Sequence, residues 1–284
     1  MSTTIISGPA DTGIAAAQGG RAQARPGVIP RLRAVLTKTF TKTVAVLTLL
    51  ALWEIAPRAG IVDPVFLPPF HEVVRALVDL AANGALAANI EASLVRSLSG
   101  FLLALAVAVP LGLLIGWYKP VSDVLTPLLQ VFLNTAALAL LPVFVLILGI
   151  GETSKIAIVC YACTWPILLN TITAVRNVDP TLLKLARSLD LSPLRLFARV
   201  VLPASVPTIF TGIRLAGASA IVVVIAAELV GAKAGLGYLI NASQYNFAIP
   251  QMYAGIVTIS VIGVVFNQLL VFVERRFTSW RTGS

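Results

Sequence analysis

The amino-acid sequence predicts an all-α integral membrane protein with about six transmembrane helices. Of its 284 residues, 58% are hydrophobic and only 12% are charged, which is about half the charged share of an ordinary soluble domain. A helix needs roughly 20 mostly apolar residues to cross a hydrocarbon core of about 30 Å, so this chain has room for about five to seven spans. Little sequence remains for a large soluble domain.

Six apolar runs of suitable length follow one another along the chain. We expect spans at about residues 40–59, 94–117, 124–148, 154–175, 206–230 and 251–273. Ahead of them, residues 1–38 mix small residues, prolines and arginines, and we expect a disordered, basic cytoplasmic tail there. Residues 39–284 then form the transmembrane domain. No small-residue cleavage site follows the first apolar run, so we expect it to stay as an anchor.

The positions of Lys and Arg predict the orientation. Six crossings return both termini to one side, and on this map that side carries fifteen of the 21 basic residues. The opposite side carries Arg58, Arg75, Arg96, Lys155 and Lys233. Cytoplasmic connectors carry an excess of Lys and Arg, so both termini are predicted to be cytoplasmic. Because these residues flank apolar runs, the net charge of +9 does not indicate a nucleic-acid partner.

Two further patterns concern packing. The outer connector, residues 60–93, has apolar positions at helical spacing between residues 73 and 82, which predicts an amphipathic helix near the membrane interface. The pairs Gly112/Gly116 and Gly231/Gly235 have the four-residue spacing that lets membrane helices approach closely.

One inner connector, residues 176–205, is longer than the others, charged and strongly patterned. Asp179 precedes Pro180, and Ser192 precedes Pro193. Each pair places a side-chain N-cap acceptor before a first-turn proline, so the pattern predicts two short helices separated by a turn at Asp190.

The first of these two predicted helices is amphipathic. Leu182, Ala186 and Leu189 share one face, while Lys184 and Arg187 fall largely elsewhere. We expect the apolar face to rest on the membrane domain and the polar edge to serve as a docking site for a cytoplasmic partner. An abrupt join at Leu202 and Pro203 is expected to connect this unit to the fifth span.

Three segments resemble the inner-membrane permeases of ATP-binding-cassette (ABC) importers, whose cytoplasmic loop carries a Glu-Ala-Ala signature, a later glycine and a closing Leu-Pro. The segments are residues 184–203, 148–155 and 226–237. They are similar to the nitrate, sulfonate and taurine branch, and the resemblance covers roughly residues 40–280. Lys184 stands where the family has glutamate, and Asp190 stands at the glycine. Asp tolerates the left-handed conformation better than most residues, so we expect the turn to survive.

The resemblance implies a MetI-like permease fold in the bacterial inner membrane. It also implies a second permease copy, two ATPase subunits that bind ATP and magnesium, and an extracytoplasmic solute-binding protein, with no cofactor in this chain. The solute would be small and anionic, such as nitrate, a sulfonate, taurine or bicarbonate. The residues implied to couple to the ATPase are Lys184, Leu185, Ala186, Arg187, Ser188, Leu189, Asp190, Leu202 and Pro203.

Polar residues inside the predicted spans are candidates for the translocation path. Unpaired polar groups are costly in hydrocarbon, so they should face protein or water. The candidates are Gln130, Asn134, Thr135, Arg214 and Glu228. The alternatives are interhelical hydrogen bonds for Asn134 and Thr135, snorkelling to the interface for Arg214, and a structural pairing of Glu228, for example with Lys233.

Two other functional classes fit the sequence less well. An ion-coupled carrier would normally show several buried carboxylates or two similar halves, and the sequence shows neither. A membrane enzyme would need converging catalytic side chains, whereas the twelve acidic residues lie mostly in connectors. The sequence also contains no Gly-x-x-x-x-Gly-Lys-Ser/Thr phosphate loop, so a separate subunit must hydrolyse the ATP. We therefore predict a non-catalytic permease, with the ion-coupled carrier as the alternative.

Overall fold

A computed structural model describes residues 44–278 of the chain. The predicted N-terminal tail, residues 1–38, lies outside the described residues. Within residues 44–278 the regular structure is entirely helical, as predicted. The chain divides into two compact units between Leu52 and Trp53, a point inside a helix that covers residues 44–58. Apart from this helix, all features described below belong to the second unit.

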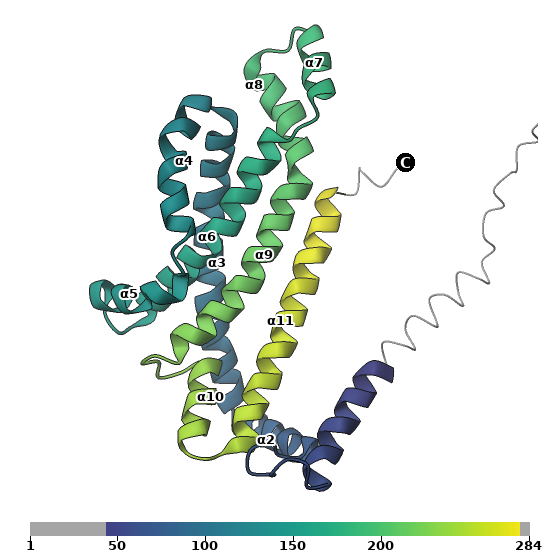
Figure 1. The fold of residues 1–284 in the computed structure, drawn as a ribbon, viewed down its shortest axis with the longest axis vertical. Helices are drawn as coiled ribbons and strands as arrows, with labels where there is room; N and C mark the ends of the chain where they lie inside the picture. The colour runs from purple at the N-terminus through teal and green to yellow at the C-terminus, as the bar shows by residue number, and fades with distance from the viewer. Residues whose placement is uncertain (1–43, 279–284) are drawn as a thin grey trace, which may run out of the picture. The chain divides into compact units, whose positions relative to one another are not determined.

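The remaining elements follow one another with short connections (Figure 1). They are α2 (Phe70–Ala82), α3 (Ala85–Trp117), α4 (Lys119–Leu133), η1 (Ala137–Leu140), α5 (Leu141–Leu148), α6 (Glu152–Arg176), α7 (Pro180–Ser188), α8 (Pro193–Leu196), η2 (Phe197–Val201), α9 (Leu202–Glu228), α10 (Leu236–Tyr245) and α11 (Ile249–Thr278). The element η1 is a 3-10 turn, and η2 is a π-helical turn.

Within the described residues, four helices are long and apolar enough to cross a membrane. They are α3, α6, the run Pro193–Glu228 that includes α9, and α11. The bent pair of α4 with η1 and α5 makes a fifth candidate. The sequence predicted about six spans, so this part of the chain has fewer. The first predicted span, residues 40–59, begins outside the described residues, and the helix seen there covers residues 44–58.

The third predicted span, residues 124–148, is broken rather than continuous. Helix α4 ends at Leu133, and the chain bends by 83° before it continues through η1 and α5. Asn134 donates through Nδ2 to the Gln130 carbonyl at 2.7 Å, and Thr135 donates through Oγ1 to the Val131 carbonyl at 3.1 Å. Such local side-chain bonds compete with helix continuation. The apolar composition on both sides of the break hides it in the sequence.

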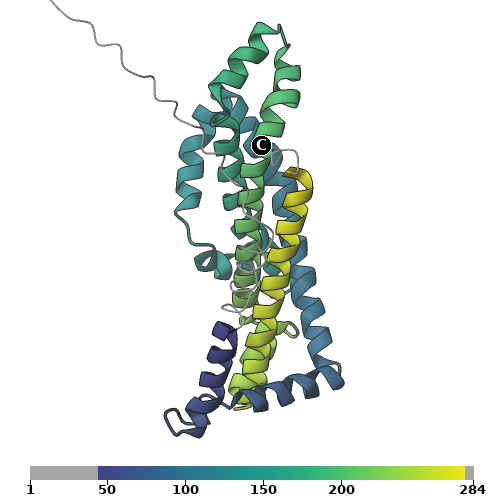
Figure 2. The same ribbon diagram turned by 90° about the vertical axis from the view of Figure 1, so that its right-hand side faces the viewer.

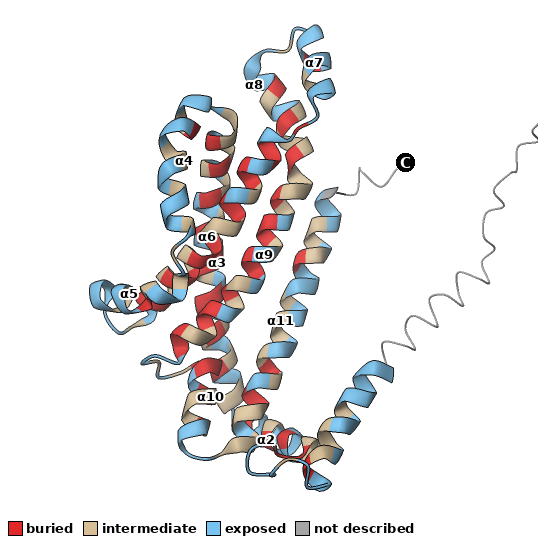
Figure 3. Cartoon of the chain, viewed as in Figure 1, coloured by how far each residue is buried: buried red, intermediate tan, exposed pale blue. Residues whose placement is uncertain are grey.

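Helices α3, α6 and α9 lie side by side and carry most of the buried residues (Figure 3). Their close approach depends on glycine. A Cβ atom at Gly112 would lie 2.7 Å from Cβ of Thr171, and one at Gly116 would lie 2.8 Å from Cβ of Val175. Both contacts are between α3 and α6, so the close approach predicted for this glycine pair is confirmed.

The second glycine pair, Gly231 and Gly235, does not pack helices together. Both residues follow the end of α9, and their φ angles are 65° and 120°. Only glycine adopts such angles readily. Here the glycines allow the chain to turn from α9 into α10, a short helix that the sequence did not predict.

The amphipathic helix predicted in the connector 60–93 is confirmed as α2. Its buried residues Val73, Ala76 and Leu80 recur at helical spacing and pack with Leu236 of α10 and Ala254 of α11. Helices α2 and α10 lie at one end of the bundle, which we call the α10 end, and Figure 2 shows α2 running across it. Helices α7 and α8 lie at the opposite end (Figure 1).

The glycine contact between α3 and α6 gives a direct test. We expect Gly112→Ala to lower the free energy of unfolding by about 1–3 kcal/mol, because the new methyl group overpacks the contact with Thr171. The matched control is Gly263→Ala in α11, where the nearest atom to the new Cβ would be 3.9 Å away. That control should be neutral or slightly stabilising, since Ala is the better helix former. Thermal unfolding in detergent compares the two, and equal stabilities would refute the packing role.

Candidate functional site

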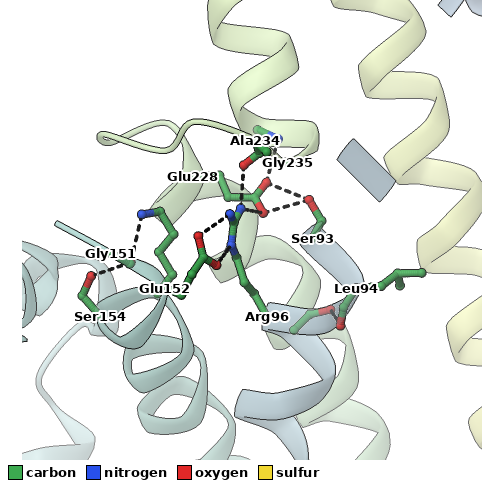
Figure 4. A network of polar contacts seen from close by, with 12 residues as sticks. Ser93, Leu94, Arg96, Gly151, Glu152, Ser154, Glu228, Ala234 and Gly235 are labelled. Atoms are coloured by element: carbon green, nitrogen blue, oxygen red, sulfur yellow. Dashed lines mark hydrogen bonds and ion pairs between the residues drawn. The ribbon is translucent and has the colours of Figure 1, made fainter. Parts of the chain in front are cut away.

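A cluster of charged side chains lies at the α10 end. It consists of Ser93 and Arg96 of α3, Glu152 of α6 and Glu228 of α9 (Figure 4), and we call it the buried ionic cluster. Arg96 donates through Nη1 to Glu228 Oε1 at 2.7 Å, and Ser93 Oγ lies 2.8 Å from both carboxylate oxygens. The side chains of Arg96 and Glu228 are 4% and 0% exposed. Each therefore depends on the other for the interactions that water would have supplied.

Glu152 binds the other edge of the same guanidinium. Arg96 donates through Nη2 to Oε1 at 2.7 Å and through Nε to Oε2. This bidentate arrangement is the strongest form of arginine–carboxylate contact. The Glu152 side chain is 63% exposed, in contrast to Glu228. The two acids of the cluster thus differ: one is enclosed by protein, and the other is open on one side.

The cluster also fixes the chain between α9 and α10. The N–H groups of Gly235, Leu236 and Gly237 donate to Asn89 Oδ1, Ser93 Oγ and Glu228 Oε2, each at 2.8 Å. These are N–H groups at the start of a helix, which the helix itself cannot satisfy. Arg96 Nη1 also donates to the Ala234 carbonyl at 2.6 Å. Side chains of α3 and α9 therefore hold α10 in place.

The sequence found only part of this cluster. The sequence makes Glu228 a translocation candidate, with Lys233 as an alternative partner; in the structure its ion-pair partner is Arg96, and Lys233 is exposed. The charge distribution predicts that Arg96 and Lys155 lie outside the membrane, yet both are buried in the protein. One signal pointed to the site, because segments 148–155 and 226–237, two of the three that carried the family resemblance, meet here. An arginine inside the apolar start of α3 was the other signal, since such a charge must be paired.

The second predicted site is the α7–α8 unit, residues 179–201, at the opposite end of the bundle. Asp179 accepts a hydrogen bond from the Thr181 N–H at 2.7 Å, which confirms the predicted cap. This backbone bond lowers the pKa of Asp179. The cap is therefore complete at neutral pH and is lost as the pH falls through the lowered pKa. Ser192 makes no side-chain cap bond, contrary to expectation. Asp190 has a φ of 50°, so the predicted left-handed turn is confirmed.

The buried face of α7 differs from the prediction. Ala186 is 3% exposed and packs with Val175 and Val201, but Leu182 and Leu189 are exposed, the latter by 66%. Leu183 packs beside Ala186 in their place. The helix carries two apolar faces, and periodicity alone did not show which one meets the bundle. Leu182, Leu185 and Leu189 form an exposed leucine stripe, whose spacing places them on one face.

The abrupt join predicted at Leu202 and Pro203 is absent. A continuous helical run extends from Pro193 to Glu228. The π-helical turn Phe197–Val201 directly precedes α9. In a regular α-helix the ring of Pro203 would clash with the carbonyl four residues earlier, and a wider turn relieves this clash. The α7–α8 unit is therefore joined to α9 by helix rather than by a loop.

The other candidate residues lie apart from one another. Lys184, Leu185, Arg187, Ser188 and Asp190 are exposed on the α7–α8 unit, and Leu202 and Pro203 are half-buried at the start of α9. Gln130 is exposed on α4, and Asn134 and Thr135 lie at the break after it. Arg214 of α9 pairs with Glu274 of α11 at 3.1 Å. The five translocation candidates thus occupy three separate places within the described residues.

Comparison with known proteins decides the class of the chain. Residues 108–279, more than half of the sequence, match the family described as "Binding-protein-dependent transport system inner membrane component". The chain belongs to this family. It is 39% identical to a probable ABC transporter permease protein of Brucella abortus, over 81% of this chain and 90% of that protein.

Other members of this transport family have more specific names. The aliphatic sulfonates transport permease SsuC of Bacillus subtilis is 31% identical, over 82% of this chain and 84% of its own length. The taurine transport system permease TauC of Escherichia coli is 31% identical, over 86% of this chain and 91% of its own length. These relatives confirm the sulfonate and taurine side of the resemblance. The family member described here is a non-catalytic, multi-pass inner-membrane component, as the sequence predicted.

A solved structure supports the fold of this family member. The MetNI methionine ABC transporter in an inward-facing conformation gives a TM-score of 0.58 at 17% identity, covering 67% of this chain and 94% of that one. The MetI-like permease fold predicted from the sequence is therefore confirmed.

The buried ionic cluster predicts that removing the charge of Glu228 destabilises the protein far more than removing the nearby charge of Lys233. Glu228→Ala should lower the free energy of unfolding by about 3–5 kcal/mol, because it leaves Arg96 and the Gly237 N–H without their buried partner. Lys233→Ala, five residues later and exposed, should change it by less than about 0.5 kcal/mol. Folded yield and thermal unfolding of the purified variants measure both effects. Similar losses in the two variants would mean that Glu228 pairs with Lys233 after all.

Proposed function

We propose that this chain forms the translocation path of an ABC importer for small organic sulfonates or closely related anions. In this proposal two copies of the chain assemble with two cytoplasmic ATPase subunits and receive solute from an extracytoplasmic binding protein. The names of SsuC and TauC support the solute class, because taurine is itself a sulfonate. The observation that carries the transport mechanism is the helical continuity from Pro193 to Glu228.

The α7–α8 unit has the surface of a docking site. Its leucine stripe leaves Leu182, Leu185 and Leu189 exposed to the solvent, which is unfavourable unless a partner covers them. Lys184 and Arg187 are exposed on the same helix. The partner surface that fits is an apolar cleft with an acidic rim. In this chain Lys184 replaces the family's glutamate, so the partner cleft should differ in charge from that of other members.

The seating of α7 explains how movement of the ATPase would reach the spans. Ala186 packs against Val175 of α6 and Val201 of the π-helical turn, so α7 is held against both membrane helices. ATP, bound with magnesium by the partner ATPase, biases the transporter only through contacts that differ between its two states. Closure of the ATPase around the α7–α8 unit supplies such contacts.

The break between α4 and α5 suggests where the two copies and the path meet. Non-helical backbone at membrane depth is tolerated only where protein covers it or water reaches it. Asn134 is exposed at this break in the single chain, and Leu146 and Ile147 of α5 are exposed nearby in sequence. We place the second copy against this side of the chain. Asn134 and Thr135 then face the water-filled path between the copies, with Gln130 one turn earlier on α4.

The proposed orientation puts the α7–α8 end in the cytoplasm and the α10 end outside. We expect reporters fused at Met1 and Ser284 to be cytoplasmic and a reporter inserted near Gly84 to be external, because most of the basic residues lie on the side of the termini. Alkaline phosphatase and fluorescent protein fusions measure the two locations. Termini on opposite sides would require an odd number of spans and would contradict this orientation.

The docking role of the leucine stripe is tested by Leu185→Asp. The exposed charge should abolish co-purification of co-expressed ATPase subunits and ATP-dependent uptake, while thermal unfolding of the permease stays within about 0.5 kcal/mol of wild type. Ala186→Glu should lose both ATPase binding and stability, since its side chain is buried. Asp190→Gly serves as the matched control and should keep full binding, because glycine favours the left-handed turn. Normal ATPase binding by Leu185→Asp would place the docking site elsewhere.

A further inference from the structure

The buried ionic cluster has one exposed acid, Glu152, and holding the helices together does not require that acid to be exposed. Glu228 is held by Ser93, Arg96 and the Gly237 N–H. Within residues 44–278, the hydrogen bonds of the Glu152 carboxylate all come from Arg96. Arg96 thus has a permanent acid on one edge and, on its Nε–Nη2 edge, an acid whose side chain is 63% exposed.

The Nε–Nη2 edge of Arg96 lies where the mouth of a transport path is expected. Arg96 precedes Trp117, at the far end of α3, by 117 − 96 = 21 residues, or about 31 Å of helix. This is about the thickness of the hydrocarbon core. A largely exposed carboxylate at this boundary of the core is hydrated rather than in contact with lipid tails, so Glu152 faces water. In the proposed orientation this water lies at the external mouth, where a delivered solute arrives.

We propose that the Nε–Nη2 edge of Arg96 is a binding site for the oxyanion of the solute, which Glu152 occupies until the solute displaces it. The proposal rests on the proposed function. A sulfonate presents two oxygens to a guanidinium edge much as a carboxylate does. The exchange keeps Arg96 neutralised and returns Glu152 to water. It therefore avoids the large penalty of burying a further unpaired charge.

Lys155 gives the displaced Glu152 a second partner. It lies three residues later on α6, a spacing at which helix side chains are neighbours. Lys155 is buried, and within the described residues its ammonium donates one hydrogen bond, to the Gly151 carbonyl at 3.1 Å. An ammonium can donate three. A Cβ atom at Gly149 or Gly151 would meet no atom within 4 Å, so the segment leading into Glu152 has space to move.

The test uses the full chain in phosphatidylcholine nanodiscs with ethanesulfonate as the probe. Ligand-observed NMR titration at constant ionic strength gives its Kd. Glu152→Gln removes the competing carboxylate charge and leaves the pair of Arg96 with Glu228 intact, so the Kd should fall at least about tenfold. Lys155→Gln should raise the Kd, because Glu152 then stays on Arg96. Ethyl methyl sulfone, an uncharged analogue, should show neither effect.

The matched control is Glu91→Gln, which removes an exposed acid from α3 without touching Arg96. Its Kd for ethanesulfonate should stay within about twofold of wild type, as expected for a screened surface charge. An unchanged Kd in Glu152→Gln, or an equal fall in Glu91→Gln, overturns the site. Co-purification of the ATPase subunits with Glu152→Gln is measured in parallel. If they bind but the Kd does not respond, the anion site is wrong and the importer proposal stands; if wild type does not bind them, the importer proposal itself fails.

Discussion

The contact between Arg96 and Glu228 is the constraint on which the rest of this membrane bundle depends. Burial makes each charge untenable alone, so α3 and α9 must stay in the register that keeps the two charges together. The same carboxylate receives the Gly237 N–H, and Arg96 reaches Glu152 on α6. One guanidinium with its two carboxylate partners therefore fixes the relative positions of three spans and the start of α10.

Around this contact the bundle has a rigid part and a peripheral part. Helices α3, α6 and α9 meet through glycines, where adding even a methyl group would cause overlap, and they enclose most of the buried apolar residues. Helices α4 and α5 expose most of their residues, and few residues of α11 are buried. Such exposure is normal for surfaces covered by lipid or by another subunit. The parts that the proposed assembly places against partners are thus the parts that the single chain leaves uncovered.

Local patterns in the sequence predicted the features that depend on neighbouring residues. The cap at Asp179 and the turn at Asp190 are of this kind, as is α6, which begins and ends within two residues of its predicted span. The partner of Glu228 lies 132 residues away, and no local pattern identifies it. The break after Leu133 was also missed, because Asn134 and Thr135 end the helix by bonding back to it, without a glycine or proline to mark the place.

The π-helical turn Phe197–Val201 has a mechanical consequence. Because it absorbs Pro203 without interrupting the helix, the run from Pro193 to Glu228 is a single rod of 36 residues, with α8 at one end and the Arg96 contact at the other. At 1.5 Å per residue the rod is about 54 Å long, so a tilt of roughly 5° about one end displaces the other by about 5 Å. A small angular change at the α8 end is thereby amplified into a displacement at the α10 end that is larger than the length of a salt bridge.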